Sequence, residues 1–138
     1  MTDIQTTNVA DSNKRVVIDH FEGSINRREP DAISRTIAID RYVDHDGPEG
    51  SSGSVEDGMR RMEAMFARFP DFHVDLLSVV AEGDMVVVRG VWSGTDAETS
   101  IRVAFRAFVQ YRLEDGRIVE RWATSTPPDP VQTRDLVW

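Results

Sequence analysis

The sequence of 138 residues contains no cysteine. This absence excludes disulfide bonds, thiolate-ligated zinc and cysteine nucleophiles. The chain also lacks an apolar run near the roughly 20 residues that a membrane-spanning helix requires. Residues 1–12 are polar and slightly acidic, unlike a secretory signal. We therefore expect a cytoplasmic protein that does not insert into a membrane.

Positive charge is scarce as well. The chain carries 16 Lys and Arg against 24 Asp and Glu, which gives a net charge of −8. Such a surface repels the phosphates of nucleic acids and the head groups of anionic lipids. We therefore predict neither a nucleic-acid partner nor a membrane partner.

Several motifs of cofactor and nucleophile chemistry are missing. His20, His45 and His73 lie far apart in the sequence, in none of the short spacings typical of a metal site. There is no glycine-rich phosphate loop and no Gly-x-Ser-x-Gly elbow. The sequence therefore predicts no bound metal, no nucleotide and no serine hydrolase chemistry.

The first half of the chain has the hydrophobic spacing of helices. After a capping Ser12 or Asn13, apolar residues recur every four positions: Val17, Phe21 and Ile25. Pro30 favours the start of a short second helix that carries Ile33 and Ile37. Residues 1–12 show no hydrophobic period, so we expect them to be frayed.

A third helix is the most clearly marked. Ser54 followed by Asp57 is typical of a capping box, and Pro70 ends the helix. The apolar residues between them recur at intervals of three and four: Met59, Met62, Met65, Phe66 and Phe69. This spacing predicts an amphipathic helix.

The second half has a hydrophobic period of two. It predicts four strands, over residues 72–81, 84–93, 101–113 and 117–126. Gly83 and Gly116 lie in tight turns, and connections this short leave neighbouring strands antiparallel. We therefore predict one α+β domain over residues 13–126, with three N-terminal helices packed on a curved antiparallel sheet of four or more strands. Residues 127–138 form a proline-rich tail.

Both faces of the strand over residues 84–93 are apolar. Val86, Val88 and Trp92 alternate with Val87 and Val91. A sheet that is apolar on both sides needs cover beyond three helices. We therefore expect a homodimer formed through the sheet.

Arg89 interrupts this apolar strand, and Glu120 stands among apolar residues on the last strand. Arg89 pairs with Glu120, anchors an anionic group of a substrate, or lies exposed at the rim of the sheet. Glu120 is either paired with an arginine or an acid of raised pKa. Trp122 packs in the core or lines a pocket.

The loop after the second helix holds a further candidate site. A neighbouring carboxylate, Asp44 or Asp46, would orient His45 and raise its pKa, which suits a general acid or base. Alternatively, the aspartates only form surface turns. Tyr42 precedes this group.

These segments, in this order, resemble SnoaL-like polyketide cyclases over about residues 13–126. The resemblance rests on residues 26–35, 42–46, 69–72, 81–84, 93–95 and 115–122. It implies the nuclear-transport-factor-two-like cone, in which helices close over a curved sheet around an apolar cavity, and usually a dimer. It also implies ring closure by aldol addition without a cofactor. His45 and Trp122 match residues of the family, but Thr126 stands where the cyclases have a catalytic aspartate.

A threonine hydroxyl is not a useful base near neutral pH, so the aldol mechanism does not transfer unchanged. Three functions stay open: a cyclase-type enzyme for a small, mostly apolar, polyketide-like molecule, a non-catalytic binder of such a molecule, or an isomerase or dehydratase. The cyclase would use acid–base groups or gain its rate by orienting the substrate. The predicted catalytic residues are His45, Asp46, Arg89 and Glu120. The predicted substrate-binding residues are Tyr42, Phe66, Trp92, Trp122, Thr124 and Thr126.

Overall fold

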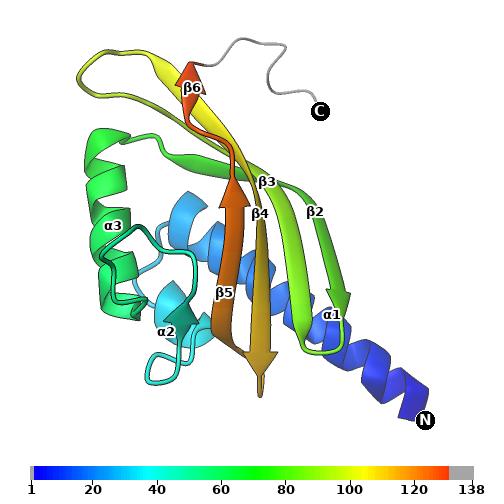
Figure 1. The fold of residues 1–138 in the computed structure, drawn as a ribbon. Coiled ribbons are helices and arrows are strands. Elements are labelled where there is room, and N and C mark those ends of the chain that lie inside the picture. The colour runs from blue at the N-terminus through cyan, green and yellow to red at the C-terminus, as the bar shows by residue number, and fades with distance from the viewer. Residues whose placement is uncertain (1, 131–138) are drawn as a thin grey trace.

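A computed structural model describes residues 2–130 of the chain, with side chains from residue 9 onward. The helices precede the long strands β2 to β5, and the short strand β1 lies between α2 and α3, as Figure 1 shows. The helical elements are α1 (Thr2–Phe21), the π-helical turn η1 (Glu22–Asn26), α2 (Ala32–Thr36) and α3 (Val55–Arg68). The strands are β1 (Val43–Asp44), β2 (His73–Glu82), β3 (Met85–Thr95), β4 (Arg102–Glu114), β5 (Arg117–Ser125) and β6 (Asp129–Pro130). The predicted α+β class is confirmed.

The apolar stripe of α1 lies in the core. Val17, Phe21 and Ile25 are 0%, 4% and 3% exposed, which confirms the predicted spacing of four. The helix begins at Thr2, earlier than the predicted cap at Ser12 or Asn13. It changes to a π-helical turn at Glu22, so that Ile25 in η1 still faces the core. The last eight residues of the predicted C-terminal tail, 131–138, lie outside the described residues.

α3 begins at the predicted cap. The hydroxyl of Ser54 accepts a hydrogen bond from the backbone N–H of Asp57 at 3.3 Å. The carboxylate of Asp57 does not complete a capping box, because it accepts hydrogen bonds from the backbone and hydroxyl of Ser52 at 2.6 and 2.5 Å. The helix ends at Arg68, two residues before Pro70.

The strands form one mixed sheet in the order β1-β5-β4-β3-β2, with β6 paired to β4. β2 to β5 form an antiparallel meander. Each of these four strands begins and ends within two residues of its predicted bounds. Gly83 (φ 58°) and Gly116 (φ 76°) adopt the positive φ that their tight turns require. β1 was not predicted, and it pairs parallel to β5 through Val43 and Asp44.

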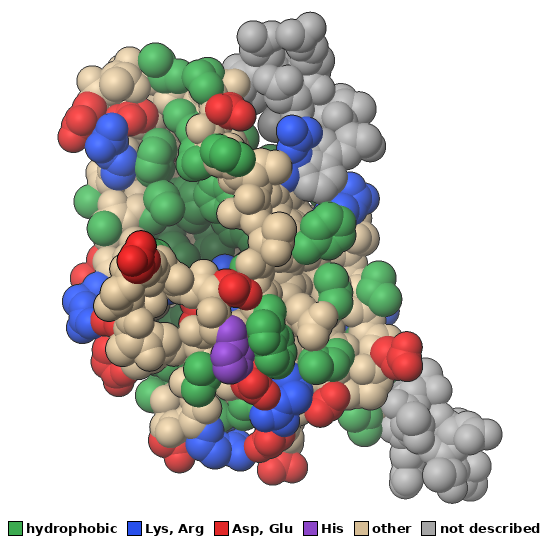
Figure 2. Space-filling view, viewed as in Figure 1, with side chains coloured by type: hydrophobic (Ala, Val, Ile, Leu, Met, Phe, Trp, Pro, Cys, Tyr) green, Lys and Arg blue, Asp and Glu red, His purple; other side chains and the backbone are tan. Residues whose placement is uncertain are grey.

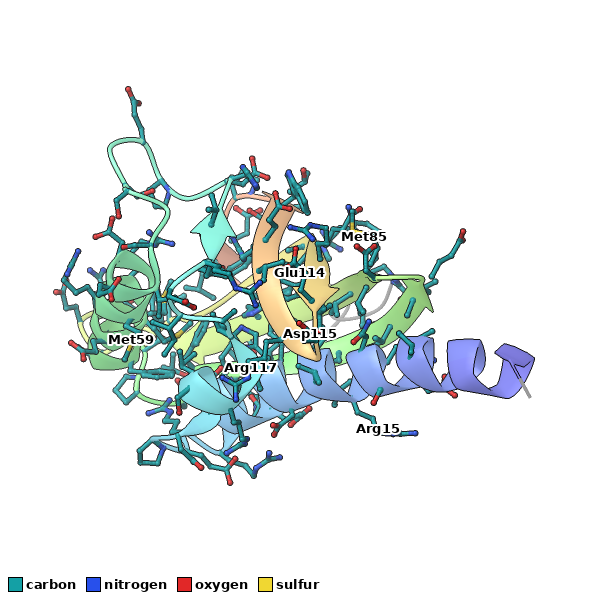
Figure 3. All side chains as sticks on the ribbon, turned by 90° about the horizontal axis from the view of Figure 1, so that it is seen from below. Arg15, Met59, Met85, Glu114, Asp115 and Arg117 are labelled. Atoms are coloured by element: carbon teal, nitrogen blue, oxygen red, sulfur yellow. The ribbon has the colours of Figure 1, made fainter. Side chains whose placement is uncertain are left out.

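The sheet has two different faces, which we call inner and outer. The inner face packs on α1, and Figure 3 shows α1 running along it while no described helix covers the opposite face. Buried residues of β3 and β4 mark the inner face: Val86, Val88, Trp92, Ala107, Val109 and Tyr111. Among residues 2–130, no helix is both long and apolar enough to cross a membrane.

Candidate functional site

α3 presents an apolar face that the rest of the protein covers only in part. Met62, Met65 and Phe66 are partly buried against the core, and Val55 is the only buried residue of the helix. Figure 2 shows this side of the molecule hollowed between α3 and β5, with hydrophobic side chains in the hollow. We call this space the α3 hollow. Its apolar side chains suit an apolar ligand.

The sheet side of the α3 hollow is aromatic and small. Trp92 of β3 and Phe105 of β4 lie opposite each other and stack with their ring centroids 5.5 Å apart. Ala123 of β5 lies on the same inner face, because it pairs with the buried Val109 of β4. On the helix side, the guanidinium of Arg28 lies 4.0 Å over the ring of Phe66. Phe66 and Trp92, both predicted to bind substrate, belong to the hydrophobic core between α3 and the inner face, and Trp92 is 5% exposed.

A polar cluster lies on the inner face beside these apolar residues. Asp44 of β1 and Arg121 of β5 are register partners, and Arg121 Nη1 donates to the two carboxylate oxygens of Asp44 at 3.0 and 3.1 Å. Arg61 of α3 reaches the same carboxylate, with Nη2 3.3 Å from Oδ2. We call Asp44, Arg61 and Arg121 the Asp44 cluster. The Asp44 side chain is only 4% exposed, whereas Arg121 and Arg61 are 27% and 36% exposed, so the carboxylate is the shielded member of the cluster.

Two tyrosines adjoin this cluster, the buried Tyr111 and the partly buried Tyr42. Burial raises the pKa of the Tyr42 hydroxyl above its ordinary value, and the nearby Arg121 guanidinium lowers it by a smaller amount. The pKa of Tyr111 is raised for the same reason. Both hydroxyls therefore remain protonated at neutral pH and can donate hydrogen bonds.

His20 of α1 is a third neutral group in this region. Burial, and to a smaller extent the charge of Arg121, lower the pKa of His20 to about 4. The Thr36 hydroxyl donates to the carbonyl of Ala32 at 2.7 Å. Its oxygen therefore accepts the contact of 3.1 Å from Nδ1 of His20, which places the proton of the neutral ring on Nδ1.

The predicted catalytic histidine lies on the outer face. His45 Nε2 is 2.7 Å from Oε2 of Glu120, and the His45 ring stacks on Trp122 with centroids 4.9 Å apart. Glu120 also accepts a hydrogen bond from Arg112 Nε at 2.5 Å. These contacts, that of Arg112 first, lower the pKa of Glu120, so Glu120 is an ionised, paired carboxylate and has no raised pKa.

Strand alternation explains this placement. Arg121 points inward with Tyr111, so its neighbours Glu120 and Trp122 point outward. Thr124 follows Trp122 on the outer face and is exposed. Thr126 bonds to the backbone of Arg106 through its hydroxyl, which accepts from the Arg106 N–H at 3.0 Å.

Arg89 also lies on the outer face of β3, opposite Phe108 of β4 and Ser78 of β2. β4 therefore separates Arg89 from Glu120, whose register partner is Arg112. Glu120 is therefore paired with an arginine, as one alternative predicted, but this arginine is Arg112 and not Arg89.

Asp46, the fourth predicted catalytic residue, bonds to the backbone of β5. Its Oδ2 accepts a hydrogen bond from the N–H of Ala123 at 2.8 Å, and its own N–H donates to Asp44 Oδ1 at 3.0 Å. These contacts tie the loop after β1 to β5. Of the ten predicted site residues, the structure brings Tyr42, Phe66 and Trp92 to the inner side.

Arg61 and Arg121 were not among the predicted site residues. Arg121 lies between Glu120 and Trp122, which point to the outer face. This position identifies Arg121 as an inner-face residue only when it is known which face of the sheet packs on the helices. The signal for Arg61 was an arginine one turn before Met65 on an amphipathic helix. Among residues 9–130, no group of three or more His, Asp or Glu side chains is arranged to hold a metal ion.

Comparisons with known proteins identify the family. The model of the SnoaL-like polyketide cyclase family matches residues 15–125. Several solved structures with the same fold come from Streptomyces. IdmH of Streptomyces antibioticus, a proposed polyketide cyclase, is 24% identical with a TM-score of 0.72, over 82% of this chain and 91% of its own. AclR of Streptomyces galilaeus, a proposed hydroxylase, is 22% identical with a TM-score of 0.72, over 85% of this chain and 90% of its own.

A third structure, TsrD of Streptomyces laurentii, is 18% identical with a TM-score of 0.73, over 83% of this chain and 88% of its own. A comparison with curated proteins finds no match. The structural neighbours show the fold, and the match to the family model covers most of the sequence. The chain belongs to the SnoaL-like polyketide cyclase family.

Proposed function

We propose that this protein is a cyclase-type enzyme that closes a ring in a small, mostly apolar, polyketide-like molecule held in the α3 hollow. The observation that carries the proposal is the apolar face of α3, which no other element covers completely. Family membership and the proposed cyclase activity of IdmH support the reaction class.

The enzyme gains its rate mainly by orientation. Holding a flexible chain with its reacting carbons close together lowers the entropic part of the barrier by several kcal/mol. Methionines on α3 adapt to an irregular ligand, and the partly buried Phe105 is held rigid by stacking on the buried Trp92. Arg121 lies at the edge of this surface, where a guanidinium can stabilise negative charge that develops on a carbonyl oxygen.

In this proposal, the group of His45, Asp46 and Glu120 positions the loop after β1. His45 and Glu120 fasten it to the outer face, and Asp46 fastens it to the backbone of Ala123. This loop in turn presents Asp44 to Arg121. The alternative role of His45 as acid or base requires a substrate on the outer face.

Adjacent residues of β5 provide the test. Ala123→Phe adds a ring on the inner face, and Thr124→Phe adds the same ring on the outer face. We expect Ala123→Phe to reduce ring closure of a linear poly-β-ketone ester by tenfold or more, measured by chromatography of the products. Thr124→Phe should stay within about threefold of the wild type. Equal effects of the two substitutions would refute the location of the site.

A second function, binding without catalysis, is favoured by two observations. The inner-face carboxylate of Asp44 is occupied by two arginines, and Thr126 stands where the resemblance to the family places a catalytic aspartate. If a ligand binds in the α3 hollow and Ala123→Phe prevents binding, but no product forms, the protein is a binder. An isomerase or dehydratase would instead release a rearranged or dehydrated product without a new ring.

We further propose a homodimer formed through the outer face. Phe108 and Val80 on this face are 53% and 64% exposed, and the half-buried Val87 lies between them. A second copy of the chain would cover these residues and so remove their apolar surface from water. A cytoplasmic location fits the absence of cysteine and stays part of this proposal.

A further inference from the structure

The Asp44 cluster contains more positive than negative charge. The guanidiniums of Arg61 and Arg121 share the single carboxylate of Asp44. Oδ1 of Asp44 also accepts from the N–H of Asp46. Among residues 9–130, no second carboxylate forms an ion pair with either arginine in the structure. One positive charge of the cluster is therefore left without a partner of opposite sign.

The neighbouring titratable groups of the described residues form no further ion pair with these arginines. The carboxylate of Asp46 accepts a hydrogen bond from the N–H of Ala123 and is not paired with Arg61 or Arg121. Burial keeps the hydroxyls of Tyr42 and Tyr111 protonated, and His20 is neutral at physiological pH. All three groups are therefore uncharged at neutral pH. The excess of one positive charge thus persists at neutral pH.

Arg61 also has donor capacity that the protein does not use. Its Nη1 is buried without a hydrogen-bond partner in the structure, 3.6 Å from the position that a Cβ of Gly47 would occupy. A buried donor without an acceptor costs about 1–3 kcal/mol, and more when the group is charged. An acceptor brought by a ligand would recover part of this cost, and an anionic acceptor would recover the most.

The cluster borders the surface that we assign to the ligand. Arg61 precedes Met65 by one helical turn on α3, and Arg121 lies two residues before Ala123 on the inner side of β5. The protein as a whole carries a net charge of −8, which repels anions at long range. Any preference for an anion must therefore come from this local cluster.

We propose that the α3 hollow selects an apolar molecule that carries one ionised oxygen, either a carboxylate or an enolate or phenolate, and that Arg61 and Arg121 bind this oxygen. The inference rests on the proposed function, because it assigns the substrate class of the same hollow. It adds that the substrate is an acid, with its charge at the β1 end of the hollow.

The test compares three naphthalene probes by isothermal titration calorimetry: 2-naphthoate, its neutral methyl ester, and 2-naphthol. The wild type should bind 2-naphthoate at least tenfold more tightly than the ester. Arg61→Met should reduce this preference to threefold or less and leave the affinity for the ester unchanged. Arg60→Met is the matched control, since Arg60 is 67% exposed on the same helix and pairs with Asp57, so the preference should persist.

Arg61→Met leaves the contact between Asp44 and Arg121 in place, so the variant should fold, which its thermal melt verifies. A lowered pKa of bound 2-naphthol, read from its absorbance, identifies the oxygen as an enolate or phenolate. An unchanged pKa together with a preference for 2-naphthoate identifies a carboxylate.

The outcomes separate this inference from the proposed function. Equal affinity of the wild type for 2-naphthoate and its ester overturns the inference and leaves an apolar ligand site intact. Equal losses in Arg60→Met and Arg61→Met also overturn it, because the effect is then one of overall charge. Absence of binding by all three probes overturns both the inference and the location of the site.

Discussion

Replacing Asp44 with asparagine is expected to lower the free energy of unfolding by about 3–5 kcal/mol. Asparagine has nearly the shape of aspartate and keeps an oxygen that accepts a hydrogen bond from Arg121. It removes the only negative charge from a site where the carboxylate is 4% exposed and meets two guanidiniums. Two unit charges about 4 Å apart attract by about 4 kcal/mol at an effective dielectric of 20. The expected loss is therefore of the order of one such pair.

The assay is urea unfolding followed by circular dichroism and tryptophan fluorescence at pH 7. Asp19→Asn is the matched control. Asp19 also contacts two arginines, Arg35 at 2.7 Å and Arg27 at 3.1 Å, but its side chain is 34% exposed. Partly solvated pairs contribute about 1 kcal/mol or less, so the control should lose far less stability. Similar losses of unfolding free energy in the two variants would refute the reasoning that burial makes the ion pairs of Asp44 more stabilising than those of Asp19.

Three further predictions concern the histidines and the outer face. His45→Ala should leave the kcat/KM of ring closure within about threefold of the wild type; a loss of about 10²-fold would restore His45 as an acid–base group. Because burial lowers the pKa of His20 to about 4, the unfolded chain binds a proton first as the pH falls below 6.5. His20 should therefore make the free energy of unfolding fall by up to about 1.4 kcal/mol per pH unit between pH 6.5 and 4, and His20→Asn should remove this slope from urea titrations; identical slopes would contradict the shifted pKa. Phe108→Arg should convert a dimer to a monomer in analytical ultracentrifugation, and a wild type that sediments as a monomer would contradict the proposed outer-face dimer.

The sequence predicted much of the fold because local signals agreed with the tertiary structure. The period of two along β2 to β5 is enforced by burial of one face, and glycines at positive φ fix the turns at Gly83 and Gly116. β1 was not predicted because a strand of two residues is too short to show an alternation of apolar and polar residues. Its pairing with β5 depends on a contact between residues nearly 80 positions apart.

The site was harder to predict because a strand pattern gives two faces without saying which one meets the helices. On the last strand, the notable residues Glu120, Trp122 and Thr124 share one parity, and Arg121 and Ala123 share the other. The conspicuous set lies on the outer face, since the inner face is decided by α1 and by the buried Tyr111. Trp92 lies on the inner face because it shares the parity of the buried Val86 and Val88 on its strand.

A crystal structure of the protein with bound 2-naphthoate tests the central claim most directly. We expect the naphthalene rings between α3 and the inner face, against Trp92 and Phe66, with the carboxylate toward Arg121. A ligand bound on the outer face beside Trp122 and His45, with the α3 hollow filled by side chains of the protein, would contradict the account.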